Sequence, residues 1–197
     1  MADLFAEDVL LVKEQVGYFK AANAYDVFTP TTGMQVAAIR EQVPNILFKL
    51  LKFTDNKTLL PFTVDILDDN SMKLLTLKRP FTLFRSRVTI YDALGQKVGA
   101  FQQRFSLGGK FDIYDAQDQQ VARLQGDWKG WNFSLVGMDG QPMAAVTKKW
   151  AGLGKELLTS ADNYVVSVQP TLTDEQLRRI VVAAAICIDM VLKEGGR

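Results

Sequence analysis

The stretch from Thr173 to Glu194 constrains the fold more than any other part of this chain. Residues Ile180 to Ile188 are apolar without a break, so a helix built from them has no polar face. A helix that is apolar all round must be buried, either in a protein core or in a bilayer. Its flanks are typical of a soluble helix, because Thr173 and Gln176 match a capping box and Gly195-Gly196 follow the last turn.

The length of the apolar run favours the protein core. A bilayer span needs about 20 mainly apolar residues. The run from Ile180 to Ile188 covers only about 14 Å at roughly 1.5 Å per residue. Arg178 and Arg179 precede it and Asp189 follows it, and a charge near mid-bilayer costs about 2.5–3.5 kcal/mol. We therefore expect a helix enclosed by the rest of the protein, and insertion into a membrane is the alternative.

The composition is ordinary for a soluble protein and excludes several kinds of chemistry. The chain has 197 residues, which suits one domain over 1–197, with 48% apolar and 23% charged residues. Its net charge is +1, so no strong basic field points to nucleic acid, and no nucleic-acid partner is expected. Histidine is absent, which removes the commonest general base and the commonest metal ligand.

The single cysteine and the first residues bear on the compartment. Cys187 lies inside the apolar run, where a thiol serves packing better than nucleophilic chemistry. One cysteine allows no internal disulfide and suits a reducing compartment. The first eight residues are acidic where a secretory signal would be basic. We expect a cytoplasmic protein, with peripheral membrane association as a variant of that expectation.

A hairpin pattern repeats through the middle of the chain. Segments 88–100, 111–123 and 133–145 each alternate apolar and polar residues, carry Gly, Asp or Gln at a turn, and then resume with small and apolar residues. This pattern predicts β-hairpins. Weaker copies begin at Tyr25, with a turn near Thr32-Gly33, and at Val64, with a turn near Asp69-Asn70.

Together with these hairpins, further strand candidates give about ten to twelve strands. The candidates are Val9–Val12, Ile46–Phe53, Leu74–Leu77, Phe101–Phe105 and Tyr164–Val168. A long antiparallel meander avoids exposed edges best by closing into a barrel. A barrel of about twelve strands is too wide for its own side chains to fill, so it needs a plug.

The C-terminal helix is the predicted plug. The sequence therefore predicts a mainly β fold: a closed antiparallel barrel of about twelve strands around a central hydrophobic C-terminal helix. The structural residues expected on that helix are Ile180, Ala184, Cys187, Ile188 and Asp189. Asp189 needs either water at a barrel mouth or a buried partner.

The end of the chain resembles the phospholipid scramblases. The matching stretches are Lys148-Lys-Trp-Ala-Gly152, Glu156-Leu-Leu-Thr-Ser-Ala-Asp-Asn-Tyr164 and Ile186-Cys-Ile-Asp-Met-Val191. The plant LURP-one-related proteins share the pattern more loosely. Both belong to the Tubby C-terminal-like group, and the resemblance, over residues 9 to 194, implies that group's twelve-stranded barrel around a hydrophobic helix. It also implies a non-enzymatic protein that binds membrane phospholipid and takes part in phospholipid scrambling.

The chain departs from the scramblases in two functional respects. It lacks the Pro-rich segment and the palmitoylated cysteine cluster of that family. The family's calcium segment overlies residues 160–171, where Ser160 and Thr171 replace acidic residues and leave Asp162 and Asn163 as ligands. A calcium loop needs about six oxygens, so calcium binding is not expected and no cofactor is predicted. Asp112, Asp115 and Asp118 are spaced only coarsely like a calcium loop and fit hairpin turns better.

Basic residues near Trp150 form the candidate lipid site. The set is Lys148, Lys149, Trp150, Lys155, Arg178 and Arg179. Cations for anionic headgroups beside an interfacial aromatic would suit a lipid surface, whereas a solvated rim with Trp150 packed on the helix is the structural alternative. A second basic stretch, with the same two interpretations, comprises Lys78-Arg79, Arg85, Arg87 and Arg104.

Two hypotheses of function remain open at the level of sequence. The first is a scramblase-family barrel that binds anionic phospholipid at a membrane surface. The second is a soluble LURP-one-like module that binds a protein partner or a ligand and has no membrane role. An enzyme is not expected, because no nucleophile elbow, metal-binding helix motif, CxxC pair or phosphate-binding loop is present. Trp128 and Trp131 are expected to pack at a barrel end, with Gly126 and Gly130 at a tight bend or bulge, and stacking on a ligand is the alternative.

Overall fold

The computed structural model describes residues 3–15, 23–42, 61–81, 85–104, 110–127, 130–148 and 163–195, with side chains in the last helix described as far as Ile188. Twelve strands and a long helix account for most of these residues. The strands are β1 (Val9–Glu14), β2 (Ala24–Phe28), β3 (Gln35–Gln42), β4 (Phe62–Leu67), β5 (Lys73–Arg79), β6 (Arg87–Asp92), β7 (Lys97–Gln103), β8 (Phe111–Asp115), β9 (Gln120–Asp127), β10 (Asn132–Gly137), β11 (Pro142–Thr147) and β12 (Tyr164–Val168).

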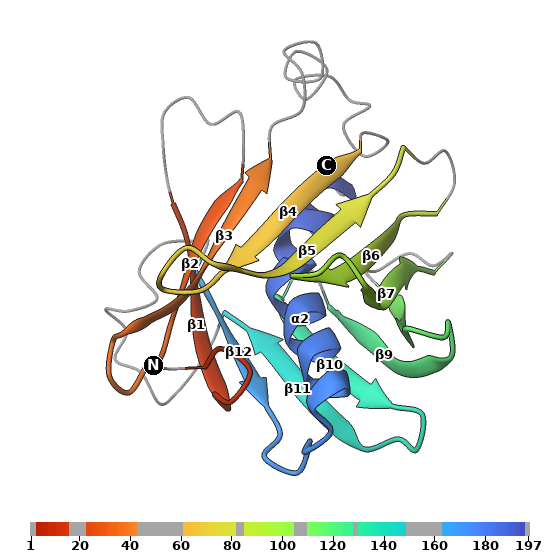
Figure 1. The fold of residues 1–197 in the computed structure, drawn as a ribbon. Helices are drawn as coiled ribbons and strands as arrows, with labels where there is room; N and C mark the ends of the chain where they lie inside the picture. Colours follow the sequence, from red (N-terminus) through yellow and green to blue (C-terminus); the bar gives the residue numbers. More distant parts are fainter. Residues whose placement is uncertain are drawn as a thin grey trace.

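The strands form a closed antiparallel barrel (Figure 1). Each strand pairs with its neighbours in sequence, and β1 closes the ring against β12, with Val9 opposite Ser167. This confirms the mainly β barrel predicted from the hairpin repeats. One strand expectation was wrong, because Phe101 belongs to β7 and does not start a strand of its own. The candidate Ile46–Phe53 lies outside the described residues.

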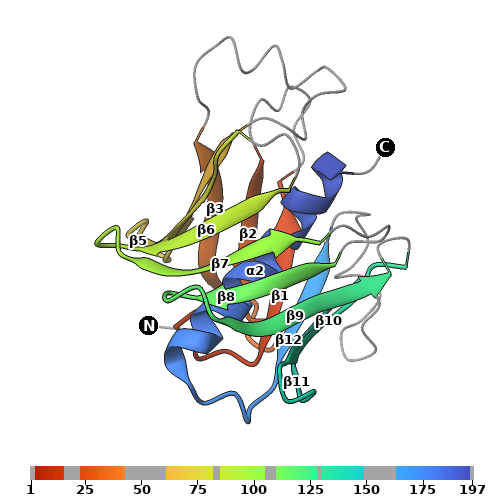
Figure 2. The same cartoon turned by 90° about the vertical axis from the view of Figure 1, so that its right-hand side faces the viewer.

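The helix α2 (Glu175–Gly195) runs through the barrel, as Figures 1 and 2 show. All residues from Ile180 to Ile188 are at most 3% exposed, including the predicted packing residues Ala184 and Cys187. The side chain of Asp189 lies outside the described part of the helix. None of the helices in the described residues is long and apolar enough to cross a membrane.

Small residues let the helix approach the barrel wall. A Cβ placed on Gly99 of β7 would lie 2.6 Å from the Tyr114 carbonyl oxygen and 2.9 Å from Cδ1 of Ile180. Real Cβ atoms do not come that close to other atoms, so β7 needs a glycine where it meets both β8 and α2. Ala183 and Ala185 on the helix are fully buried and add no bulk.

The start of α2 corrects the predicted cap by one residue. The helix begins at Glu175, and Asp174 caps it, because Asp174 Oδ1 accepts a hydrogen bond from the Leu177 backbone N–H at 2.7 Å. The Thr173 N–H is bound to the Thr171 carbonyl oxygen at 3.0 Å in the preceding turn. Thr173 and Gln176 therefore do not form the predicted capping box.

An aspartate builds the turn in two of the three repeated hairpins. Asp92 Oδ1 accepts hydrogen bonds from the backbone N–H groups of Leu94 and Gln96, and Asp115 Oδ1 accepts the equivalent pair two and four residues on. The residue two positions before the second strand has a positive φ, 80° at Gly95 and 62° at Asp118. This shared turn chemistry explains why the hairpins are recognisable in the sequence.

We predict that Cys187 is inert in the folded protein. The thiol is buried on α2, and burial raises its pKa from 9.0 to about 12. The thiolate is the reactive form, and very little of it is present at about pH 8. A chromogenic disulfide reagent should therefore leave the native protein unmodified and should titrate one thiol per chain after unfolding in guanidinium. Rapid labelling without denaturant would contradict the burial of α2.

Candidate functional site

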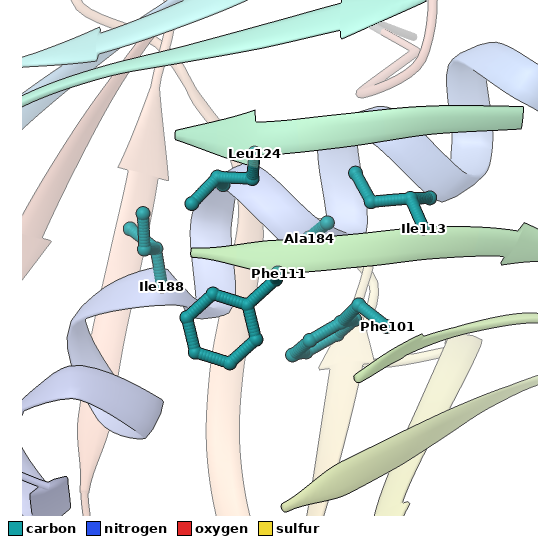
Figure 3. Close-up of a pocket in the computed structure, with 6 residues that line it drawn as sticks. All are labelled: Phe101, Phe111, Ile113, Leu124, Ala184 and Ile188. Carbon is teal, nitrogen blue, oxygen red and sulfur yellow. The ribbon is translucent and has the colours of Figure 1, made fainter. Parts of the chain in front are cut away.

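The interior of the barrel holds no space for a ligand in its described part. A cavity of ≈ 10 Å³ lies between α2 and strands β7, β8 and β9. Figure 3 shows the side chains that line it, all apolar: Phe101, Phe111, Ile113, Leu124, Ala184 and Ile188. Ligand pockets usually occupy about 300–1,000 Å³, and an apolar cavity of this size stays dry. The helix thus takes the place that a ligand occupies in other wide barrels.

In the part of the chain that the structure describes, two larger hollows lie on the outer face of strands β3 to β6. Two adjoining hollows, of ≈ 500 Å³ and ≈ 340 Å³, share Gln42, Lys78 and Tyr91. We call them together the Lys78 groove. Its other lining residues are Pro61, Phe62, Thr63, Arg79, Pro80 and Thr89 on one side, and Lys73, Thr76, Asp92, Ala93 and Gly95 on the other.

Strand register places hydroxyl groups on both sides of Lys78. Thr63 on β4 and Thr89 on β6 are the direct cross-strand partners of Lys78 on β5. Side chains at such positions start about 4.5–5.5 Å apart on the same face. Arg79 points to the other face because side chains alternate along a strand, and its guanidinium lies 4.4 Å from the centroid of the buried Phe62 ring.

Lys78 differs from most described cations because no described carboxylate pairs with it. Its Nζ lies 5.4 Å from the centroid of the Tyr91 ring. Ion pairs join Arg40 to Asp26, Lys73 to Asp65, Arg87 and Lys97 to Asp118, Arg104 and Arg123 to Asp112, Arg178 to Asp8, and Arg179 to Glu175. Within the second basic stretch, Lys78 is thus the cation that faces outward into a hollow with its charge uncompensated.

The buried carboxylate of Asp65 holds two side chains of the groove wall in place. Asp65 accepts hydrogen bonds from Thr76 Oγ1 at 2.6 Å and Gln42 Nε2 at 2.5 Å, and Lys73 Nζ lies 3.1 Å away. Desolvation by burial raises the pKa of Asp65, but the hydrogen bonds from Thr76, Gln42 and Lys73 outweigh it. The pKa therefore lies below its ordinary value of 3.8. The carboxylate stays charged at neutral pH and fixes Gln42 and Thr76 in the groove wall.

The predicted site around Trp150 falls largely outside the described residues. Lys149, Trp150 and Lys155 lie there. Lys148 is described, and its Nζ lies 4.0 Å from the centroid of the Trp131 ring. Trp131 in turn packs against Phe133 and Tyr164, with ring centroids 5.9 Å and 5.8 Å apart. Trp131 therefore contacts the core as expected, and Trp128 is not described.

Arg178, the next member of that set, is buried and holds the segment before β1. Its Nε donates to the Phe5 carbonyl oxygen, and its Nη2 donates to the Glu7 carbonyl oxygen at 2.9 Å and to Asp8 Oδ1 at 2.7 Å. Weaker contacts of 3.4 Å reach the carbonyl oxygens of Ala6 and Leu172. The donors of Arg178 are thus engaged inside the protein.

The structure does not bring Lys148 together with Arg178 and Arg179. Thr147, next to Lys148, pairs with Val165 near the start of β12. Asp8, the partner of Arg178, accepts a hydrogen bond from Val168 at the end of β12. Val165 and Val168 are three residues apart on β12, which corresponds to about 10 Å at roughly 3.3 Å per residue. Arg179 pairs with Glu175 at 2.6 Å and lies over the Phe5 ring.

The residues considered for calcium do not form a cluster where they are described. Asp162 lies outside the described residues, and Asn163 is buried just before β12. Asp115 accepts turn hydrogen bonds, Asp112 pairs with Arg104 and Arg123, and Asp118 pairs with Arg87 and Lys97. Across the described ranges, no group of three acidic, histidine or cysteine side chains could hold a metal ion.

Comparisons of sequence agree with the fold. A family model described as Scramblase matches residues 5–194. A phospholipid scramblase family protein of Schizosaccharomyces pombe is 27% identical over 98% of this chain and 57% of its own length. Altered inheritance rate of mitochondria protein 25 of Saccharomyces cerevisiae is 24% identical, over 93% of this chain and 69% of that protein. Phospholipid scramblase 2 of Bos taurus is 27% identical over 68% of this chain and 50% of that protein, so the chain spans between half and about two thirds of these relatives.

A solved structure confirms the architecture. The X-ray structure of an Arabidopsis thaliana protein superposes with a TM-score of 0.52 at 12% identity, over 93% of this chain and 91% of that one. At this identity the likeness concerns the fold alone. It matches the barrel with a central helix expected from the resemblance to the LURP-one-related and scramblase proteins.

Proposed function

The chain belongs to the scramblase family, and we propose that it binds anionic membrane phospholipid, without enzymatic chemistry, through the Lys78 groove. The observation that carries the proposal is the Lys78 cation, which pairs with no described carboxylate, in a hollow of ≈ 500 Å³ on the outer barrel face. Its relatives include proteins named phospholipid scramblases. Membrane association is what this family membership implies in general.

The groove has the chemistry to bind a phospholipid headgroup. The Lys78 ammonium offers three donors to a phosphodiester anion, and the hydroxyls of Thr63 and Thr89 can donate from either side. Pro61 and Pro80 line the same hollow and offer apolar surface to the glycerol and the first methylene groups of the lipid. The hydrophobic helix is not required for this contact, since α2 is enclosed by the barrel.

Charge reversal at Lys78 should weaken binding to anionic vesicles. Each cation near an anionic surface contributes about 1 kcal/mol. Replacing Lys78 with Glu removes that attraction and adds a repulsion, so we expect the affinity to fall by roughly 30-fold, about 2 kcal/mol. The measurement is co-sedimentation with vesicles of phosphatidylserine and phosphatidylcholine at low salt, against vesicles of phosphatidylcholine alone.

A matched variant separates the groove from a diffuse attraction. Lys110→Glu makes the same charge change at an exposed residue just before β8, three strands along the barrel wall from β5 and outside the groove. It should weaken binding far less than Lys78→Glu does. Equal losses for the two variants would overturn the Lys78 groove as the site. The double variant Lys148→Glu with Lys149→Glu tests the other predicted basic set, and a loss confined to that variant would move the site there.

Lipid movement between leaflets is the second part of the proposal and rests on the names of the relatives. Fluorescent phospholipid in vesicles with the purified protein should equilibrate between leaflets faster than in empty vesicles, measured with and without calcium. If vesicle binding depends on Lys78 but lipid equilibration between leaflets is not faster, the headgroup site is supported and scrambling is rejected. A chain that binds neither vesicle type would favour a soluble interaction module.

A further inference from the structure

Four large apolar side chains in the described ranges are exposed in turns at the end of the barrel where α2 begins. Among the described residues, the exposed large apolar side chains are Met34, Met72, Phe81, Leu94 and Met138. All except Phe81 lie in the turns that follow β2, β4, β6 and β10. Successive strands of the meander alternate in direction, so these turns share the end at which α2 begins, whereas Phe81 follows β5 at the opposite end. We call this end, made of turns 29–34, 68–72, 92–96, 115–119 and 137–141, the hairpin rim.

The turns themselves do not require these apolar side chains. In the β6–β7 turn, the Asp92 carboxylate and the positive φ of Gly95 provide the geometry, and Leu94 contributes only its backbone N–H. Asp68 has the same role in the β4–β5 turn, where Met72 also contributes its backbone N–H. Turn positions normally carry small or polar residues, yet Leu94 is 83% and Met72 is 64% exposed. Exposed apolar groups that the fold does not need are typical of a binding surface.

The rim is also acidic. Carboxylates stand beside the apolar tips and at the start of α2, at Asp68, Asp69, Asp92, Asp115, Asp139, Asp174 and Glu175. The cations that reach the rim are already neutralised, because Lys97 pairs with Asp118 at 2.6 Å and Arg179 pairs with Glu175 at 2.6 Å. Lys97, above all, and Arg87 lower the pKa of Asp118, which therefore stays ionised. The rim thus combines apolar tips with uncompensated negative charge.

A hollow lies beside the Leu94 tip. It measures ≈ 320 Å³ between the β6–β7 hairpin and the first turn of α2. Its walls are Asp92, Gln96, Lys97, Val98, Glu175, Gln176 and Arg179. A long cationic side chain can place its aliphatic part against Val98 there and its charge beside Asp92, because Lys97 and Arg179 in the same walls are paired with Asp118 and Glu175.

We propose that the hairpin rim binds a basic amphipathic segment of a protein partner. Methionine side chains adapt to differently shaped apolar surfaces and are used in this way by proteins that bind amphipathic helices. The carboxylates select a partner whose polar face carries Lys or Arg. A membrane fits the rim poorly, because anionic headgroups would be repelled and the described apolar tips include no aromatic residue of the kind that anchors at interfaces. The lipid proposal rests on a different side chain, since Lys78 lies at the other end of β5, although Asp92, Ala93 and Gly95 belong both to the rim and to the second hollow of the Lys78 groove.

The test uses a fluorescent synthetic peptide of lysine and leucine arranged as an amphipathic helix, titrated with the full chain and followed by anisotropy. A scrambled peptide of the same composition and a glutamate–leucine peptide serve as controls. We expect the lysine–leucine peptide to bind best and its affinity to fall with added salt. Methyl NMR signals of Met34, Met72 and Met138 should shift on binding.

Matched variants locate the contact. The double variant Met72→Ser with Leu94→Ser should weaken peptide binding about tenfold or more, which corresponds to about 1.4 kcal/mol. Phe81→Ser removes an equally exposed apolar side chain from the opposite end and should leave the affinity unchanged. The substituted side chains are solvent-exposed, so both proteins should fold, which circular dichroism will verify.

Four results would overturn the proposal. The first is that the Met72→Ser/Leu94→Ser variant and Phe81→Ser bind the lysine–leucine peptide with equal affinity, and the second is that the glutamate–leucine peptide binds as tightly as the lysine–leucine peptide. The third is that the lysine–leucine peptide does not bind at all. The fourth is that the chain associates with itself and that Leu94→Ser abolishes this self-association. Binding to neutral phosphatidylcholine vesicles that depends on Met72 and Leu94 would likewise reject it, because the rim would then be a lipid-inserting surface.

Discussion

Deleting residues 173–194 should abolish cooperative unfolding. The deletion removes the run from Ile180 to Ile188, which is buried along its whole length and fills the barrel interior. Loss of a single isoleucine from a core costs about 2–5 kcal/mol. The loss of Ile180, Ile186 and Ile188 alone is comparable with the stability of a typical domain, about 5–15 kcal/mol. Urea denaturation followed by tryptophan fluorescence should show no sigmoidal transition, and size-exclusion chromatography should show aggregates.

A shorter truncation provides the control for this deletion. Removal of residues 196–197, which follow α2, should leave the transition intact. The competing interpretation, that the helix is a membrane anchor, makes the opposite prediction. A soluble, monomeric and cooperatively unfolding product that had lost only its membrane association would contradict the plug.

The second large effect is expected at Arg178. Replacement with Ala would leave the carbonyl oxygens of Phe5 and Glu7 without their donor in a buried site and would free the Asp8 carboxylate. A buried acceptor left unsatisfied costs about 1–3 kcal/mol, and the loss of the ion pair adds less because the Asp8 carboxylate is half exposed. We therefore expect the urea midpoint to drop strongly, and the segment before β1 to become accessible to proteases.

Arg179→Ala is the matched control. Arg179 is adjacent in sequence, but its guanidinium is more than one third exposed and pairs with Glu175 one turn away on the same helix. Exposed pairs with this spacing contribute about 0.3–0.5 kcal/mol. A loss of similar size in the two variants would show that Arg178 does not clamp the N-terminal segment. Arg178→Lys should recover only part of the loss, because an ammonium cannot reproduce the planar fork of donors.

The barrel and its plug could be predicted from the sequence because two patterns, the alternating strands and the helix that is apolar all round, require the same fold. Alternation with a period of two, interrupted by Asp- and Gly-containing turns, marks strands such as β6 and β7, and only a wide closed sheet can enclose a helix with no polar face. The helix start was harder to place. Thr173 and Asp174 are both good caps, and the turn that binds the Thr173 N–H decides in favour of Asp174.

The candidate sites were less predictable because charge partners are distant in sequence. In the sequence Arg178 belongs to a group of basic residues, yet its hydrogen-bond acceptors come from residues 5 to 8, at the other end of the chain. Lys78 and Arg79 read as a basic pair, whereas strand alternation sends Lys78 outward and Arg79 inward. Alternation could have separated those two before the structure was known. The burial of Arg178 had no signal in the sequence.

Closure of the barrel between β1 and β12 has a consequence for synthesis in the cell. Val9 pairs with Ser167, so β1 can pair with β12 only after about 150 further residues have been translated. At roughly 5–20 residues per second this delay is about 8 to 30 seconds. During that interval the early hairpins have an open edge and no helix to cover their apolar face, a state prone to pairing with other chains. We expect the nascent chain to depend on chaperones until α2 emerges from the ribosome and fills the barrel.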